Sequence, residues 1–350
     1  MSGTDFLFGL KDQSYDAAVS LIPVPWEATA SYGKGAGSGP EAVRAASVQV
    51  DLADLQFGSV WKSGLTWRPT AETIRNWDRQ AADDAHRVIE NDGIQGNPEL
   101  AEAVSRVDAL GGQVAGLVEE HAKQAFASGQ IPAVLGGDHS SPLGLIRASA
   151  RRHPGLGILH IDAHADLRLA YLGFAGSHAS IMRNVLAIEE VGRLVGVGYR
   201  DIGDEEGDLL RTGAPRLVPF FDQLLASRMA NGDRWTDICA EIVDALPEQV
   251  HLSMDIDGLD PSLCPATGTP VPGGLGFHQL GLLLETLSRR RRVVSFDLCE
   301  VVPGVPIAGK ADGWDAIVGA RVLYKLIGCA VRSQEGWLER GGAKVGSVWL

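Results

Sequence analysis

Residues 156–166 read Leu-Gly-Ile-Leu-His-Ile-Asp-Ala-His-Ala-Asp, and this stretch decides the fold. A largely apolar run, residues 156–161, is followed at once by Asp162, His164 and Asp166. A short and nearly continuous apolar run is typical of a parallel strand that is covered on both faces. Polar residues directly after such a strand lie at its carboxyl end, where open α/β sheets bind ligands. The stretch therefore predicts a buried strand that leads into a ligand site.

Further runs of the same kind predict the rest of a parallel sheet. They cover residues 17–24, 131–135, 194–197, 250–254 and 293–296. Helical patterns lie between them, at residues 99–127, 141–152, 180–190, 235–246, 278–290 and 314–326, and Gly39-Pro40-Glu41 opens one more. Strands that alternate with helices predict an α/β fold with helices on both faces of a parallel sheet. We expect one domain over residues 1–350.

Residues 58–98 depart from this alternation. The segment is polar, contains Trp61, Trp67 and Trp77, and shows no strand pattern. We expect it to be an insertion or a lid that faces a partner.

Composition excludes several classes of protein. The 350 residues carry a formal net charge of −13, which repels nucleic acid and anionic lipid. The sequence has no stretch of about 18 apolar residues, so no membrane span is expected. Residues 1–10 lack the pattern of a signal peptide, and the four cysteines form no C-x-x-C. These features favour a cytoplasmic protein with reduced thiols.

Four of the predicted strand ends carry residues of the kind that bind metals. The clusters are Gly136-Gly137-Asp138-His139-Ser140, Asp162-Ala163-His164-Ala165-Asp166, Asp255-Ile256-Asp257-Gly258-Leu259-Asp260-Pro261 and Asp297-Leu298-Cys299-Glu300. In an extended chain a period of two aims Asp162, His164 and Asp166 the same way. Two histidines and four aspartates bring together too much negative charge unless cations neutralise it. Two divalent ions would do so, and this ligand set suits manganese, with nickel, cobalt or zinc as alternatives.

Each motif has a plainer interpretation when it is taken alone. D-x-H-x-D is often a surface turn, G-G-D-H is compatible with a tight turn and a helix cap, and Asp257-Gly258 is ordinary turn chemistry. Their placement at four strand ends favours the metal site. Asp138 and Asp260 are predicted to be structural acceptors of backbone N–H groups.

The motifs at residues 136–140, 162–166 and 253–261 resemble the three signatures of the ureohydrolase family, which includes arginase, agmatinase, guanidinobutyrase and formimidoylglutamase. The resemblance extends over about residues 22–326. It includes Pro265-Ala266-Thr267-Gly268-Thr269-Pro270, where Ala266 replaces a usual glycine. It implies the three-layer arginase-like fold, two metal ions and a homo-oligomer of three or six copies.

The resemblance also implies a role for each matched residue. One metal would be bound by His139, Asp162, Asp166 and Asp255, and the other by Asp162, His164, Asp255 and Asp257. Glu300 would pair with the substrate guanidinium, and His178 would transfer protons. We therefore expect His178, Glu300 and Asp166 to be the catalytic residues. The plainer alternatives are a capping or exposed loop histidine for His178, and a structural acid paired with Arg321 for Glu300.

The expected reaction is hydrolysis of a small linear guanidino compound to urea and an amine, with agmatine giving putrescine. The segment Asp166-Leu167-Arg168 with Ser177-His178-Ala179 resembles one branch of the agmatinases. The alternatives are guanidinobutyrate, arginine, guanidine or formimidoylglutamate as substrate, or a catalytically silent ureohydrolase-like subunit. All six ligand positions, His178 and Glu300 are present, which disfavours the silent subunit. The signatures also disfavour a metal-dependent deacetylase.

Arg168 leaves the substrate open. Facing the site, it would attract a carboxylate and repel the distal amine of agmatine. Turned away, it would tie down its loop through an acid such as Asp201.

Overall fold

The structure is a computed structural model, and it describes residues 7–10, 17–213, 215–305 and 313–338. Its centre is an eight-stranded sheet in which all neighbouring strands are parallel, in the order β2-β1-β3-β8-β7-β4-β5-β6. The strands are β1 (Val19–Val24), β2 (Leu65–Trp67), β3 (Ile131–Gly136), β4 (Leu156–Ile161), β5 (Val191–Val197), β6 (Leu217–Phe220), β7 (Gln249–Asp255) and β8 (Arg292–Cys299).

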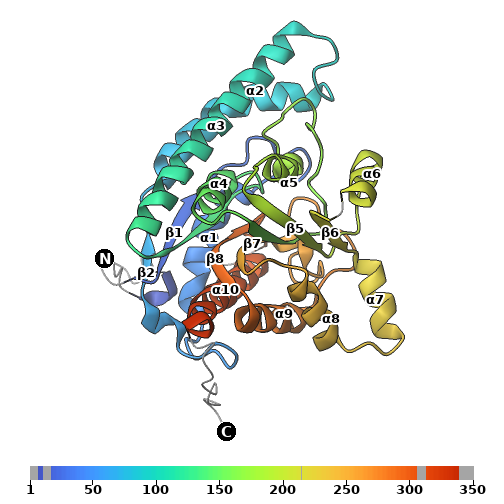
Figure 1. The fold of residues 1–350 in the computed structure, drawn as a ribbon. Helices are drawn as coiled ribbons and strands as arrows, with labels where there is room; N and C mark the ends of the chain where they lie inside the picture. The colour runs from blue at the N-terminus through green and yellow to red at the C-terminus, as the bar shows by residue number, and fades with distance from the viewer. Residues whose placement is uncertain (1–6, 11–16, 214, 306–312, 339–350) are drawn as a thin grey trace.

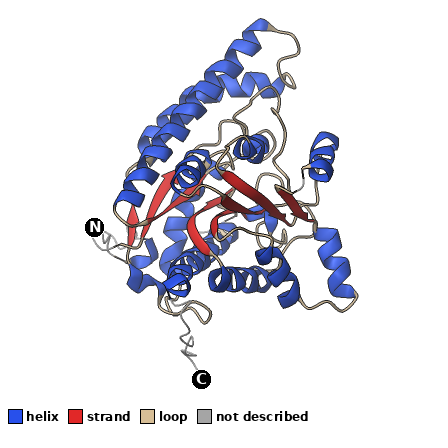
Figure 2. Ribbon diagram, in the orientation of Figure 1, coloured by secondary structure: helices blue, strands red, loops and turns tan. Residues whose placement is uncertain are grey.

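The helices form a layer on each face of this sheet, as Figures 1 and 2 show. They are α1 (Gly39–Ala46), α2 (Ala71–Glu90), α3 (Pro98–Ala127), α4 (Leu143–Arg152), α5 (Ile181–Leu186), α6 (Asp204–Thr212), α7 (Asp222–Ala230), α8 (Trp235–Asp244), α9 (Phe277–Arg290) and α10 (Trp314–Leu338). Helices α2 to α5 cover one face, and α1, α8, α9 and α10 cover the other. The predicted α/β fold with helices on both faces of a parallel sheet is confirmed.

Successive side chains along each buried strand point to opposite faces of the sheet, and on both faces they are apolar. Leu21 and Leu135 point into the apolar cluster under α1 and α10, whereas Ile22 and Val134 point into the cluster under α2, α3 and α4. Burying apolar side chains on both faces stabilises a strand at roughly 25 cal/mol per Å² of apolar surface. A nearly continuous apolar run is therefore what such a strand requires.

The expectation that residues 58–98 contain no strand is wrong. Leu65–Trp67 form β2, which pairs with β1 at the edge of the sheet. Neither this strand nor β6 at the opposite edge is long enough to show a period, so the sequence did not predict them. The rest of the segment includes α2, which packs along α3. None of residues 58–98, all of which are described, lines the cavity defined below. Its assignment as an insertion or a lid stays a prediction.

Helix boundaries follow the sequence patterns with a few differences, the largest being that α10 continues to Leu338 where the pattern ended at residue 326. Helices α2, α6 and α7 were not predicted, and α5 ends at Leu186 rather than at residue 190. Helix α3 runs through Gly111 and Gly112, since the helix is held by packing against both α2 and α4. Among the described residues, no helix has the length and apolar character needed to cross a bilayer.

Candidate active site

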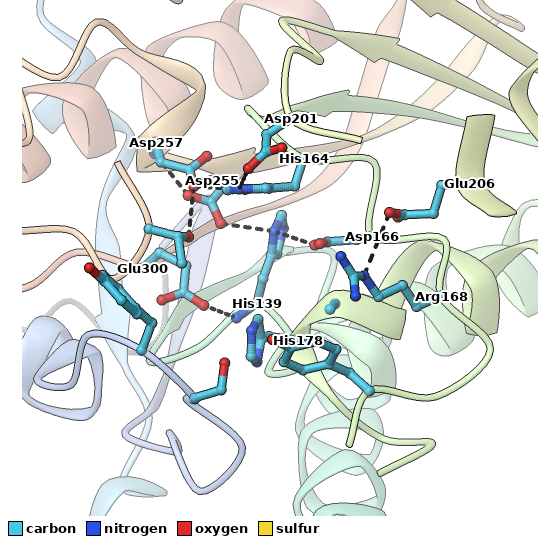
Figure 3. Close-up of a pocket in the computed structure, with 15 residues that line it drawn as sticks. His139, His164, Asp166, Arg168, His178, Asp201, Glu206, Asp255, Asp257 and Glu300 are labelled. Carbon is cyan, nitrogen blue, oxygen red and sulfur yellow. Dashed lines mark hydrogen bonds and ion pairs between the residues drawn. The ribbon is translucent and has the colours of Figure 1, made fainter. Parts of the chain in front are cut away.

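The carboxyl ends of β3, β4, β7 and β8 meet at one edge of the sheet, beside a cavity of about 250 Å³. Figure 3 shows the side chains that line it. Five of the six predicted metal ligands are among them, and Asp162 lies beneath. The predicted catalytic residues His178, Glu300 and Asp166 line the same cavity. The structure therefore brings all of these residues together, while their roles stay predictions.

His139 is the centre of the first group of ligands. Its Nδ1 lies 3.0 Å from Oδ2 of Asp162, 3.1 Å from Oδ2 of Asp255 and 3.4 Å from Oδ2 of Asp166. The ring is fully buried. These four side chains are the set predicted to hold one metal ion.

His164 is the centre of the second group. Its Nδ1 lies 3.1 Å from Oδ2 of Asp257 and 3.5 Å from Oδ1 of Asp162. Asp162 therefore presents one carboxylate oxygen to each histidine. Asp255 lies between the groups as well, because its Oδ1 accepts a hydrogen bond from the backbone N–H of Asp257 at 2.8 Å. This placement fits the predicted bridging of two ions by Asp162 and Asp255.

The charges of the cluster favour the binding of cations. Burial and the neighbouring carboxylates raise the pKa of Asp255 well above its usual range, and that of Asp166 to about 6. Burial opposes protonation of His164, yet Asp162 and Asp257 outweigh it and raise the pKa of this ring to about 12. Without positive partners, the carboxyl groups of this cluster cannot all stay ionised. Its carboxylate and imidazole donors fit two divalent metal ions.

Backbone conformation aims two of the acidic side chains. Asp166 and Glu300 have φ values of 52° and 61°, in the left-handed region that residues other than glycine seldom adopt. Such strain persists where the surrounding structure imposes it, and it is common at functional sites. The expectation that an extended chain aims Asp162, His164 and Asp166 alike is therefore only partly correct, because the chain turns at Asp166.

No arginine among the described residues pairs with Glu300. Its Oε1 accepts a hydrogen bond from the backbone N–H of His139 at 2.8 Å, whereas Arg321 donates to the carbonyl oxygen of Ile317. The structural alternative that pairs Glu300 with Arg321 is wrong. Burial and the nearby carboxylate of Asp138 raise the pKa of Glu300 well above its usual range, so a cation beside it is favoured.

His178 lines the same cavity (Figure 3) and lies at the start of a short 3₁₀ helix, His178–Ser180. Its Nδ1 is 3.4 Å from the hydroxyl oxygen of Thr29, which donates to buried Asp138 at 3.0 Å. Asp138 also accepts from the backbone N–H of Ser140, which agrees with the structural role predicted for it. Burial and the nearby positive rings of His164 and His139 lower the pKa of His178 to about 4, so this imidazole is neutral at pH 7.

Arg168 lines the cavity, and the acid beside it is Glu206 rather than Asp201. Its Nε lies 3.6 Å from Oε2 of Glu206, and its guanidinium lies 4.8 Å from the centre of the Tyr171 ring. Asp201 also lines the cavity. The wall that would face a substrate tail therefore carries two carboxylates and one guanidinium.

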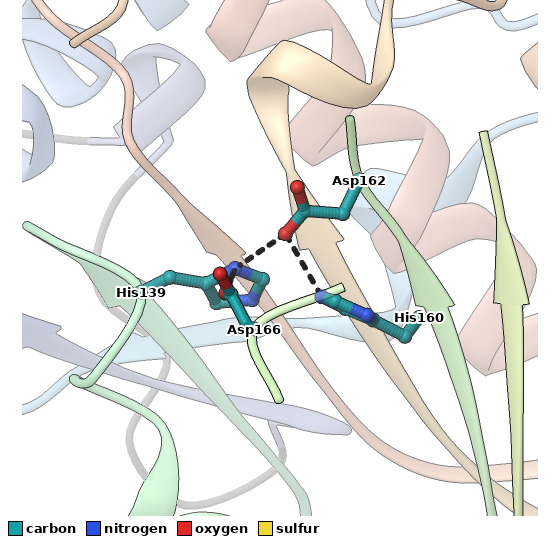
Figure 4. Close-up of side chains that lie close together, drawn as sticks. All are labelled: His139, His160, Asp162 and Asp166. Carbon is teal, nitrogen blue, oxygen red and sulfur yellow. Dashed lines mark hydrogen bonds and ion pairs between the residues drawn. The ribbon is translucent and has the colours of Figure 1, made fainter. Parts of the chain in front are cut away.

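Two polar residues behind the cluster were missed because they lie inside apolar runs of the sequence. His160 on β4 has its Nε2 2.9 Å from Oδ2 of Asp162 (Figure 4), and its Nδ1 is 2.7 Å from the hydroxyl of Tyr199. On β7, Nε2 of His251 lies 2.7 Å from Oδ2 of Asp297. A histidine within a buried strand beside strand-end aspartates is a signal that was present in the sequence.

Asp297 connects this second layer to His139. Nε2 of His139 is 2.9 Å from Oγ of Ser253, which donates to Oδ1 of Asp297 at 3.2 Å. Burial raises the pKa of Asp297, but the hydrogen bond from His251 and the nearby ring of His139 outweigh it and lower that pKa. Through Ser253, the ionised carboxylate of Asp297 orients the His139 ring so that Nε2 faces Ser253 and Nδ1 faces the aspartates of the cluster.

Replacing Asp297 by asparagine is expected to weaken metal binding by about 10–100-fold, the usual cost of losing such an outer partner. The measurement is a competition titration with a chelator. Ser149→Ala is the control, because Ser149 contacts Ser295 at the far end of this network and leaves Asp297 untouched. Equal affinities in the wild-type protein and the Asp297→Asn variant would contradict the assignment.

The chain is similar to known proteins over nearly its whole length. The model of the arginase family matches residues 17–328. The N(1)-aminopropylagmatine ureohydrolase of Thermus thermophilus is 32% identical over 336 residues, which cover 95% of this chain and 97% of that protein. The agmatinase of Pyrococcus horikoshii is 28% identical over 91% of this chain and 93% of its own length.

The fold is also that of a solved structure. The agmatine ureohydrolase of Thermoplasma volcanium has a TM-score of 0.67 at 23% sequence identity, and the alignment covers 95% of this chain and 94% of that one. A similarity at this level supports the three-layer architecture and carries no information on the substrate.

Proposed function

Since the chain belongs to the arginase family, whose members use a binuclear metal site, we propose that it hydrolyses agmatine to urea and putrescine. The observation that carries the proposal is the convergence of His139, His164 and four aspartates on a cavity that Glu300 and His178 also line. One cavity thus contains side chains that can bind metal ions, a carboxylate that can bind a guanidinium and an imidazole that can transfer protons.

We assign one metal ion to His139, Asp162, Asp166 and Asp255, and the other to Asp162, His164, Asp255 and Asp257. When bound, two divalent ions, manganese in this proposal with nickel as the alternative, supply a water of lowered pKa as the nucleophile. The remaining chemistry belongs to the side chains around them.

Glu300 orients the substrate in this proposal. A guanidinium presents paired N–H donors, and a carboxylate accepts them through charge-assisted hydrogen bonds. The backbone N–H of His139 holds Oε1 of Glu300 and so limits its rotation. The acid also supplies the negative charge that a cationic guanidinium needs in a buried site.

His178 moves the proton. An amine leaves only when it is protonated, and a neutral imidazole can accept a proton during attack and return it to the departing nitrogen. The contact of Nδ1 with Thr29 leaves Nε2 as the atom that carries this proton. Burial lowers the pKa of the ring, which favours the neutral imidazole that can accept this proton.

A second substrate is N(1)-aminopropylagmatine, which the name of the Thermus thermophilus relative favours. It carries the same guanidino group on a longer cationic chain, so the same residues would act on it. We further propose that the enzyme is a homo-oligomer of three or six copies and is cytoplasmic. The four cysteines, all buried free thiols, support the last point.

The test is a product screen with protein loaded with manganese or nickel. The substrates are agmatine, N(1)-aminopropylagmatine, arginine, guanidinobutyrate and guanidine, with urea as the product measured, and formimidoylglutamate, with formamide measured. Release of urea from a guanidino compound supports the proposal. Metal-loaded protein that acts on none of them would favour the silent subunit.

We predict that agmatine or N(1)-aminopropylagmatine exceeds arginine and guanidinobutyrate in kcat/KM by about tenfold or more, or roughly 1.4 kcal/mol. The reason is that the wall carries two negative charges, on Asp201 and Glu206, against the one positive charge of Arg168, and so favours a cationic tail. If arginine or a guanidino acid is instead preferred by tenfold, Arg168 binds its carboxylate. Arg168→Ala would then lose the acidic substrate selectively.

A further inference from the structure

The loop of residues 167–177 carries two side chains of the cavity wall and leads directly into His178. Arg168 and Tyr171 line the cavity, and the Tyr171 ring lies edge-on to His178 with 6.0 Å between their centres. Apart from the bridge between Tyr171 and Phe174, the loop has no regular secondary structure. Contacts from outside the loop must therefore hold its shape.

Glu206, Ala179 and Asn184 make hydrogen bonds to the backbone of the loop, and further contacts come from the hairpin of α2 and α3, whose connection reaches the loop in Figure 1. Phe174 is buried in the apolar cluster that includes Val104 and Val107 of α3. Gly173 has φ 98°, and a Cβ atom there would come within 2.8 Å of Ile94, which lies between the two helices. The backbone of the loop thus packs directly on the hairpin.

Asp108 of α3 makes the polar part of this contact. Its Oδ2 accepts a hydrogen bond from the backbone N–H of Ala175, and its Oδ1 accepts one from that of Gly176, both at 3.1 Å. One carboxylate therefore binds two consecutive peptide N–H groups. Hydrogen bonds to an ionised acceptor are the stronger kind, and two of them fix both position and orientation.

The bonds that His178 makes itself are weaker. Its backbone N–H donates to Thr29 Oγ1 at 3.4 Å, and its Nδ1 lies at the same distance from that oxygen. Both distances are at the long end for a hydrogen bond. The hydrogen bond from the backbone N–H of Gly176 to Asp108 is therefore shorter than either bond that His178 itself makes to Thr29.

We propose that Asp108 is a positioning residue that acts through His178, by clamping the loop of residues 167–177 onto α3. The inference rests on the proposed function, since it assigns Asp108 to the same reaction. It also gives the α2–α3 hairpin, which lies outside the cavity, a part in catalysis. Misplacing a reacting group by about 1 Å costs up to roughly 10²-fold in rate, so the clamp has a measurable effect.

The kinetic test is a double-mutant cycle of Asp108→Ala with His178→Asn. Asp108→Ala alone is expected to lower kcat by about 10–100-fold, with metal content unchanged and KM altered much less. Asp108→Asn, which keeps one acceptor oxygen, should lose less. In the His178→Asn background, Asp108→Ala should lower kcat no further, because residues that act as a unit are not additive.

Glu102→Ala is the matched control, since it removes an exposed carboxylate from the same helix and leaves the loop untouched. An equal loss from Asp108→Ala in both backgrounds, or no loss in either, would overturn the proposal. An equal loss would mean that Asp108 supports the fold and not His178.

Amide hydrogen exchange gives a readout that does not depend on activity. Peptides that cover residues 172–178 should exchange at least about tenfold faster in Asp108→Ala than in the wild-type protein or Glu102→Ala, because two protecting hydrogen bonds are lost. Unchanged exchange would overturn the clamp itself. If the wild-type protein hydrolyses no guanidino compound, the proposed function fails, and the exchange experiment still decides whether Asp108 holds the loop.

Discussion

Asp257→Ala is expected to bind one metal ion per chain where the wild-type protein binds two, and to lose turnover by about 10³-fold or more. Losing an ion that contributes several kcal/mol to transition-state stabilisation corresponds to a factor of this size. Asp257 is buried, and its Oδ2 faces Nδ1 of His164 at 3.1 Å. Metal analysis of the saturated proteins and urea release measure the two effects.

Two further variants separate metal binding from folding. Oδ1 of Asp257 accepts a hydrogen bond from the backbone N–H of Ala163 at 3.0 Å, so Asp257→Asn keeps this bond and removes only the charge. Asp260→Ala, in the same loop, removes a carboxylate that accepts from the backbone of Ser262, and should retain both ions. Two bound ions and near-normal turnover in Asp257→Ala would show that Asp257 is not a ligand.

His178→Asn is expected to lower kcat by about 10²–10⁴-fold, the usual contribution of a positioned proton-transfer group, while both metal ions remain bound. The ring lines the cavity, and its hydrogen-bond contact is with Thr29 rather than with a predicted metal ligand. Steady-state kinetics together with metal content distinguish a catalytic loss from a binding loss.

His86→Asn is a suitable control for this substitution. His86 is exposed on α2 and pairs with Glu90, far in sequence from the strand ends. It should turn over like the wild-type protein. Unchanged turnover in His178→Asn would return His178 to the role of a loop histidine.

Local sequence was sufficient where a single segment both forms a strand and ends in ligands. The runs before His139, Asp162 and Asp255 became β3, β4 and β7, and the residues after them meet at one edge. The physical reason is that parallel strands point their carboxyl ends the same way, so ligands that follow different strands are gathered by the sheet itself. The pattern needed no knowledge of side-chain contacts.

The orientation of individual side chains could not be predicted from local sequence. The backbone of Asp166, whose Oδ2 lies 3.4 Å from Nδ1 of His139, adopts φ 52°. Arg168 lies beside Glu206, which belongs to a helix that the sequence did not predict. Edge strands β2 and β6 were missed because three or four residues show no period. These features depend on neighbours distant in the chain.

The sequence by itself thus determined the fold class, the edge of the sheet that holds the site, and the kinds of group present there. Only the tertiary structure decided how those groups are supported. Asp297 holds His139 through Ser253 from strands that lie side by side, and Asp108 clamps a loop 67 residues further along the chain. Both contacts join surfaces that are brought together by packing, and no local period or spacing encodes such a pairing.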